Sequence, residues 1–101
     1  MSISKTRTSF YRRLYVAHLI DGGRASSVPA IVEATGMPRR TAQDTLAALA
    51  ELDIRCEFEQ AAGERHRIGR YVIRDWGPIA PDWVARHAEE LARTLGYPPP
   101  P

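Results

Sequence analysis

Four polar residues, Arg39, Arg40, Thr41 and Gln43, are of types that can recognise the edges of nucleic-acid bases. Arginine can form two hydrogen bonds with O6 and N7 of guanine, and glutamine can do the same with N6 and N7 of adenine. Threonine can contact a phosphate or the methyl group of thymine. These four residues therefore predict base reading, provided that one element presents them together.

The segment that must position them, residues 28–52, is predicted to form two helices joined by a tight turn. Val28, Ile31 and Val32 are spaced as the apolar face of a first helix. Gly36 predicts the end of that helix, because glycine readily takes the left-handed conformation, and Pro38 is compatible with the first turn of a second helix. In the second helix one side is apolar, with Ala42, Leu46, Leu49 and Ala50, and the opposite side carries Arg40, Thr41 and Asp44.

Residues 54–74 change from helical to alternating periodicity, which predicts a β-hairpin. Ile54, Cys56 and Phe58 alternate with charged residues, so Cys56 is expected to be a small buried side chain and not a reactive thiol. The loop and the return strand are basic, which suits contacts with phosphates or the minor groove, with a solvated hairpin tip as the alternative. The basic residues there are Arg65, His66, Arg67, Arg70 and Arg74.

Two further helices flank these elements, at residues 5–20 and 82–95, and a proline tail at 98–101 is predicted to be disordered. The first helix is apolar on most sides and so needs two partners, one being the helix pair and the other a second subunit. Ser26 or Ser27 can cap the helix that begins at Val28. A short strand at 25–28, pairing with the hairpin, is an alternative for that connector.

The string Gly36-Met37-Pro38-Arg39-Arg40-Thr41-Ala42 resembles the turn and second-helix start of bacterial winged helix-turn-helix regulators, and the order of the later segments resembles that family too. The resemblance implies a single domain over 1–101 that is mainly α with a small β-hairpin: a three-helix core, a wing and an additional C-terminal helix. In that family the second helix of the pair enters the major groove of double-stranded DNA. Carried over, the groove-facing residues are Arg39, Arg40, Thr41, Gln43 and Asp44, and the wing contributes Arg65, Arg67 and Arg70.

Charge is distributed unevenly along the chain, although its net value is only +2. Residues 1–26 have a local charge of +4, so Lys5 and Arg7 are candidates for backbone contacts made by the first helix, the alternative being a solvated charged face. Residues 27–54 have a local charge of −2. Asp44 departs from the basic pattern, since phosphate repels a carboxylate unless it accepts from a cytosine amino group or pairs with Arg40.

Several classes of protein are disfavoured. No apolar run reaches the roughly 20 residues of a membrane helix, and the N-terminus lacks the apolar core of a signal peptide. A single cysteine, Cys56, excludes an internal disulfide and suits a cytoplasmic location. The sequence contains no glycine-rich phosphate loop, paired metal ligands or nucleophile motif, so we expect no enzyme activity, no cofactor and no metal.

We therefore expect a transcriptional regulator that binds double-stranded DNA sequence-specifically. A homodimer formed through the first and C-terminal helices would place its recognition helices about 34 Å apart on a palindromic target. The alternative is a winged-helix protein-interaction or assembly module without DNA binding, which is suggested by Asp44, by the acidic balance of residues 27–54 and by the apolar surplus of the terminal helices.

Overall fold

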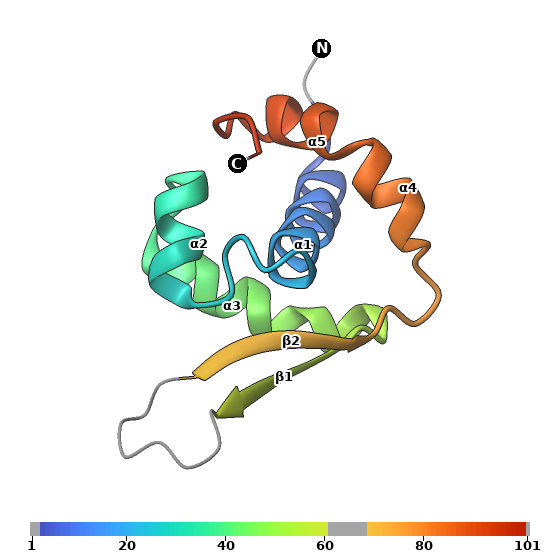
Figure 1. The fold of residues 1–101 in the computed structure, drawn as a ribbon. Coiled ribbons are helices and arrows are strands. Elements are labelled where there is room, and N and C mark those ends of the chain that lie inside the picture. Colours follow the sequence, from blue (N-terminus) through green and yellow to red (C-terminus); the bar gives the residue numbers. More distant parts are fainter. Residues whose placement is uncertain (1–2, 61–68, 101) are drawn as a thin grey trace.

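A computed structural model describes residues 3–60 and 69–100 of the chain. A bundle of helices lies on one side of a two-stranded hairpin, which extends away from it (Figure 1). In chain order the elements are α1 (Lys5–Asp21), α2 (Val28–Thr35), α3 (Arg39–Ala48), the 3-10 turn η1 (Leu49–Leu52), β1 (Arg55–Gln60), β2 (Gly69–Asp75), α4 (Pro81–Arg86) and α5 (Ala88–Leu95). The mainly helical fold class with a hairpin is confirmed.

Helix α1 forms the centre of the core. Four consecutive residues, Leu14 to Ala17, are at most 1% exposed, so the helix is covered on every side along this stretch. The cover comes from α3, α4, α5 and β2, all of which contact α1 within the same chain. Helix α1 is apolar on most sides and therefore needs a second packing partner. Helices α4 and α5 supply it, so a second subunit is not needed to bury this part of α1.

The turn between α2 and α3 is held by local hydrogen bonds. The Ser27 hydroxyl accepts from the Ala30 N–H at 3.2 Å and caps the start of α2, as predicted. At the other end Gly36 takes the left-handed conformation, with φ 79°, and its N–H donates to the Val32 carbonyl at 2.7 Å. The buried Thr35 hydroxyl donates to the Ile31 carbonyl and accepts from the Met37 N–H, which fixes the chain direction entering α3.

The hairpin pairs β1 and β2 antiparallel, with Phe58 opposite Tyr71 and Glu59 opposite Arg70. Cys56 and Ile73 pack against the core, as the alternation predicts, but Phe58, which is expected to face inward with Cys56, is 53% exposed and lies edge-on to Tyr71. The Tyr71 N–H also donates to the Ser26 carbonyl at 2.8 Å. Residues 25–28 are not a strand, because Val28 already begins α2, but this single bond does tie the connector to the hairpin as the alternative prediction required.

The C-terminal segment corrects one prediction. In place of a single helix over 82–95, the chain forms α4 and α5 with a break at His87. The His87 ring stacks on Trp83, with centroids 4.0 Å apart, and its Nδ1 lies 2.7 Å from the Trp83 carbonyl oxygen. Both ring contacts lie at the break, where the Trp83 carbonyl also still accepts the His87 N–H at 3.1 Å.

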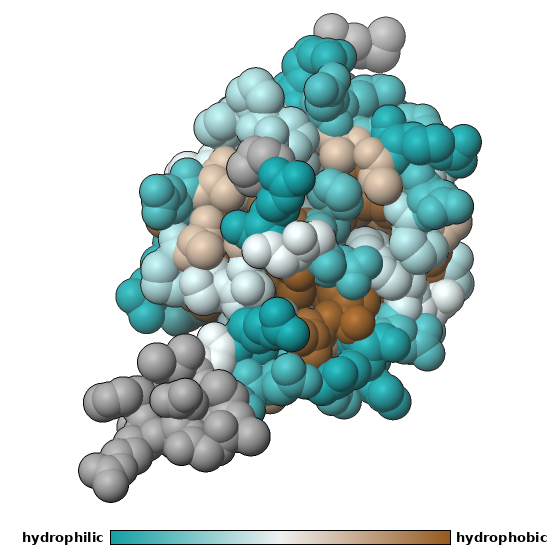
Figure 2. All heavy atoms as spheres, in the orientation of Figure 1, coloured by the Kyte–Doolittle hydropathy of each residue, from teal (hydrophilic) through white to brown (hydrophobic). Residues whose placement is uncertain are grey.

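The ends of α1 and β2 meet beside a small surface hollow. Trp76 Nε1 donates to the Asp21 carboxylate at 3.1 Å, which links the two elements where both of them end. Between them lies a hollow of about 130 Å³, whose apolar lining includes Ile20, Val72 and Ile73. Figure 2 shows a hydrophobic area in this region, surrounded by hydrophilic residues. Within the described part of the chain, no helix is long and apolar enough to span a membrane.

Candidate nucleic-acid interface

The exposed side of α3 carries most of the side chains expected to read bases. Arg39, Arg40 and Gln43 are exposed, whereas Ala42 and Thr45 face the core. Ala47, one turn beyond Gln43, is exposed as well, so the N-terminal half of this face is polar and its C-terminal half carries a small side chain. This arrangement suits a helix that inserts its first turns into a groove.

Arg40 and Asp44 form an ion pair along α3. The Arg40 Nε lies 3.8 Å from Asp44 Oδ2, and the two side chains are 88% and 71% exposed. Exposed pairs of this spacing contribute no more than about 0.5 kcal/mol, so the pair does little to stabilise the fold. Its consequence is electrostatic: one of the two arginines at the start of α3 has a carboxylate beside it.

A polar hollow of about 270 Å³ separates α3 from α1. Thr41 is half-buried and lines this hollow, so it lies on the flank of α3 and not on its most exposed face. Asp44 forms part of the same wall. The facing wall belongs to α1 and includes Arg12 and Arg13, and the Arg12 Nε donates to the Tyr97 hydroxyl at 3.2 Å.

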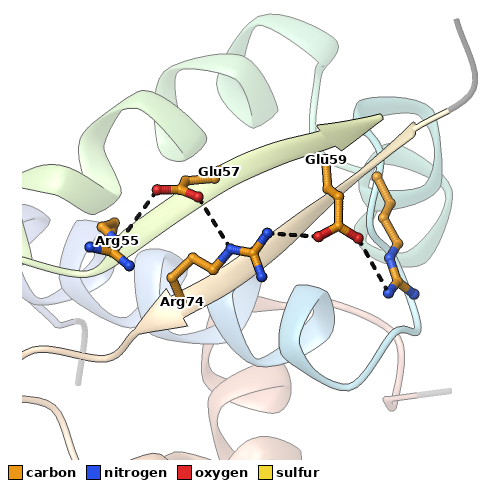
Figure 3. Close-up of polar contacts among 5 residues, drawn as sticks. Arg55, Glu57, Glu59 and Arg74 are labelled. Atoms are coloured by element: carbon orange, nitrogen blue, oxygen red, sulfur yellow. Dashed lines mark hydrogen bonds and ion pairs between the residues drawn. The ribbon is translucent and has the colours of Figure 1, made fainter. Parts of the chain in front are cut away.

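The outer face of the hairpin carries a ladder of ion pairs. Arg74 bridges two carboxylates: its Nε lies 3.2 Å from Glu57, and its Nη2 lies 2.6 Å from Glu59 (Figure 3). Arg55 pairs with Glu57 at 3.4 Å, and Arg70 pairs with Glu59 at 3.8 Å. The hydrogen bonds to Glu59 and Glu57 raise the pKa of Arg74 above its usual value. The arginines of both strands are thus already matched with carboxylates.

The helix pair followed by a hairpin has the form of a winged helix, and comparison with known families decides the assignment. A family model described as winged helix-turn-helix matches residues 5–95. The chain belongs to the winged helix-turn-helix family. Among solved structures, it is similar to the crystal structure of a DUF2131 family protein from Shewanella amazonensis SB2B, with a TM-score of 0.88 and 45% sequence identity over 95% of this chain and 91% of that one. A comparison with curated proteins finds no match.

In the winged-helix arrangement, α3 holds the position of the recognition helix and the hairpin holds that of the wing. Of the predicted site residues, α3 brings Arg39, Arg40, Gln43 and Asp44 together on its solvent side. Arg70 lies on the wing, but it is paired with Glu59. The predicted wing residues Arg65 and Arg67 lie outside the described residues.

Lys5 and Arg7 are not brought near the wing. Both are exposed in the first turn of α1, which lies beside α5 at the end of the bundle away from the hairpin (Figure 1). Arg7 lies over the Tyr11 ring, with its guanidinium carbon 5.6 Å from the ring centroid. The basic residues that α1 does place beside the recognition helix are Arg12 and Arg13. Both contribute to the positive charge of residues 1–26. The sequence does not distinguish them from Lys5 and Arg7, because the distinction depends on which side of α1 faces α3.

Metal binding and a reactive thiol are the two other kinds of site considered for the described residues. The described residues contain no group of three or more His, Cys, Asp or Glu side chains that is placed to hold a metal ion. Cys56 is half-buried, and its pKa is raised, first by burial and then by the nearby Glu57. A raised pKa lowers the thiolate fraction, so the thiol is a poor nucleophile and a poor metal ligand near neutral pH.

Proposed function

We propose that this winged helix binds double-stranded DNA sequence-specifically and acts as a transcriptional regulator. The observation that carries the proposal is the solvent face of α3, where Arg39, Arg40 and Gln43 are exposed at the start of a recognition helix. Arginine and glutamine at these positions can form bidentate hydrogen bonds with guanine and adenine. A cytoplasmic location fits this role and belongs to the same proposal.

Backbone contacts are assigned to the hollow beside α3. Arg13 faces this hollow from α1 and makes no ion pair with another described residue. It can meet a phosphate while the ridge of α3 enters the major groove. Arg12 borders the same hollow and is held by Tyr97. Phosphate contacts from α1 would fix the orientation of the recognition helix without reading sequence.

A salt series with duplex DNA tests the proposal directly. Fluorescence anisotropy with a mixed-sequence duplex should show binding that weakens as salt rises, because binding releases counterions from the phosphates. The variant Arg39→Ala/Arg40→Ala should lose most of this binding, whereas Arg93→Ala, which removes one positive charge from the exposed surface of α5, should keep it. If the folded wild-type protein neither binds at about 50 mM salt, where phosphate contacts are strong, nor enriches any sequence from a random duplex pool, DNA binding is ruled out as the function.

The functional unit is proposed to be a homodimer formed through the first and C-terminal helices. Two large apolar side chains remain exposed on these elements, Phe10 at 36% on α1 and Trp83 at 39% on α4. A two-fold dimer would bind a palindromic site with half-sites one helical turn apart. Sedimentation analysis of wild type and Phe10→Ser/Trp83→Ser tests it, with a shift toward monomer expected in the variant. A wild-type protein that sediments as a monomer at high concentration would contradict the dimer.

The second candidate function is a protein-interaction module that keeps the fold but does not bind DNA. The ion-pair ladder of the hairpin favours it, because the carboxylates of Glu57 and Glu59 offset the positive charge that a wing would present to phosphate. The same salt series separates the two functions. A folded protein without salt-sensitive binding would favour the interaction module.

A further inference from the structure

Asp44 is the only acidic residue in the recognition helix α3, whose sequence is RRTAQDTLAA. Its carboxylate is mostly exposed and lies where the reading face meets the hollow beside α1. On the reading side it pairs with Arg40, and on the hollow side it shares a wall with Thr41 opposite Arg12 and Arg13. This carboxylate therefore stands between the arginines of the two helices.

A carboxylate in this position opposes binding that depends on phosphates alone. DNA of any sequence presents the same negative backbone, and its affinity comes from cations that neutralise phosphates. Asp44 reduces that attraction on both sides, because it offers Arg40 an internal anionic partner and repels a phosphate that enters the hollow. The consequence is a lower affinity for DNA in general.

A cytosine in the major groove reverses this effect. Its N4 amino group donates a hydrogen bond, which Asp44 can accept, and the guanine of the same pair presents O6 and N7 to an arginine. Adenine also presents an amino group, but its neighbouring N7 is an acceptor that repels a carboxylate. Arg40, which is exposed and paired with Asp44 across one turn of α3, can exchange the carboxylate for the guanine.

We propose that Asp44 is a specificity determinant that makes tight binding conditional on a cytosine–guanine pair facing α3, while it suppresses base-independent binding. The proposal rests on the proposed function, since it concerns how the same helix reads DNA. It predicts that removing the negative charge of Asp44 strengthens binding to random DNA and weakens discrimination between sequences.

The test compares wild type with Asp44→Asn, which keeps the size of the side chain and removes its charge. A matched control is Glu90→Gln, which removes one negative charge from the exposed surface of α5. Binding is measured by anisotropy with a random-sequence duplex and with a duplex selected from a random pool by the wild-type protein. The pools selected by wild type and by Asp44→Asn are then sequenced.

We expect Asp44→Asn to bind the random duplex several-fold more tightly and with a steeper salt dependence, whereas Glu90→Gln binds like wild type. The ratio of selected to random affinity should fall by about ten-fold, the scale of one mismatched base pair. The cytosine present in the wild-type selection should be lost from the variant's selection. An unchanged selected sequence, or equal gains in Asp44→Asn and Glu90→Gln, would overturn the proposal.

The proposed function fails in a different way. If wild type and Arg39→Ala/Arg40→Ala bind the random duplex equally, α3 does not read DNA. If that double variant loses binding while Asp44→Asn behaves like wild type on both duplexes, DNA binding by α3 stands and the role assigned to Asp44 is wrong.

Discussion

Tyr15 and Tyr97 pack together with ring centroids 5.9 Å apart, yet their hydroxyl groups are in opposite situations. The Tyr97 hydroxyl accepts a hydrogen bond from Arg12 at 3.2 Å. The Tyr15 hydroxyl is buried and has no hydrogen-bond partner among the residues that the structure describes. Burial is the main cause that raises the pKa of Tyr15, and Tyr97 adds to it, so this hydroxyl stays neutral. Replacing each tyrosine by phenylalanine therefore removes a hydroxyl without a hydrogen-bond partner in one case and with a partner in the other.

Replacing Tyr15 by phenylalanine should stabilise the fold. A buried hydroxyl without a partner has lost its hydrogen bonds to water and gained none in return, so its removal should raise the free energy of unfolding by about 1 kcal/mol. Urea unfolding followed by circular dichroism measures the change. A loss of stability in Tyr15→Phe would show that a bound water satisfies this hydroxyl.

Replacing Tyr97 by phenylalanine should destabilise the fold. The substitution removes the acceptor for Arg12, which joins α1 to the segment that follows α5. The expected decrease in the free energy of unfolding is about 0.5 to 1.5 kcal/mol, the range for one hydrogen bond. Both variants lose one tyrosine hydroxyl and nothing else. If the free energy of unfolding rises in Tyr15→Phe and falls in Tyr97→Phe, the difference comes from hydrogen bonding and not from packing. A change of the same sign in both would contradict this account.

His18 should make the stability of the protein depend on pH. It is half-buried on α1, and burial lowers its pKa; Asp21 acts in the opposite direction, and Arg24 lowers the pKa further. Because the unfolded state then binds a proton more readily than the folded state, the contribution of His18 to the free energy of unfolding is greatest above about pH 6.5. It should fall as the pH drops below about 6.5 and level off below the folded pKa.

The pH prediction is measured by urea unfolding between pH 8 and pH 5 in wild type and His18→Gln. The difference between the two proteins reports His18 itself, since the remaining titratable groups are shared. We expect the variant to show a smaller decrease in stability on acidification. Parallel curves would mean that the pKa of His18 is the same in the folded and unfolded states.

Gly77 should tolerate alanine poorly for two separable reasons. Its φ of 60° is unfavourable for a residue with a side chain, and a Cβ there would overlap the backbone carbonyl of Asp53. Gly96 has a similar φ of 78° but nothing within 4 Å of its Cβ position. Gly96→Ala should therefore cost about 1 kcal/mol from backbone strain, and Gly77→Ala should cost clearly more. Equal losses in thermal unfolding would show that the loop around Asp53 moves aside.

The sequence predicts the local parts of this fold well because their causes are local. The cap at Ser27 and the turn at Gly36 depend on neighbouring residues, and both occur where the pattern places them. Periodicity does not reveal the break at His87, because the apolar stripe continues across both α4 and α5. The pattern also cannot show that α4 and α5 return to cover α1, because this packing is between segments far apart in the sequence.

In the candidate site, too, features with a local cause are predictable from the sequence and features with a tertiary cause are not. The exposure of Arg39, Arg40 and Gln43 follows from helical periodicity, whereas the position of Thr41 on the flank depends on how α1 packs against α3. The approach of Arg12 and Arg13 to the recognition helix has the same tertiary cause. The sequence also leaves the wing arginines without partners, because their pairing depends on strand register.

The ion pairs that this register brings together on the wing can be tested by removing one carboxylate. Glu59 contacts both Arg70 and Arg74, so Glu59→Gln should release Arg70 and leave Arg74 paired with Glu57 alone. All three side chains are substantially exposed, and the free energy of unfolding should change by less than about 1 kcal/mol. If the wing meets DNA, the released arginine should strengthen binding to a random duplex and steepen its salt dependence by about one phosphate contact. The matched substitution Glu90→Gln on α5 controls for net charge.

Tighter binding in Glu59→Gln alone would mean that the ladder limits the wing's contact with phosphate. Unchanged binding, together with loss of binding in Arg39→Ala/Arg40→Ala, would mean that the outer face of the hairpin stays away from DNA and that α3 and α1 make the contacts.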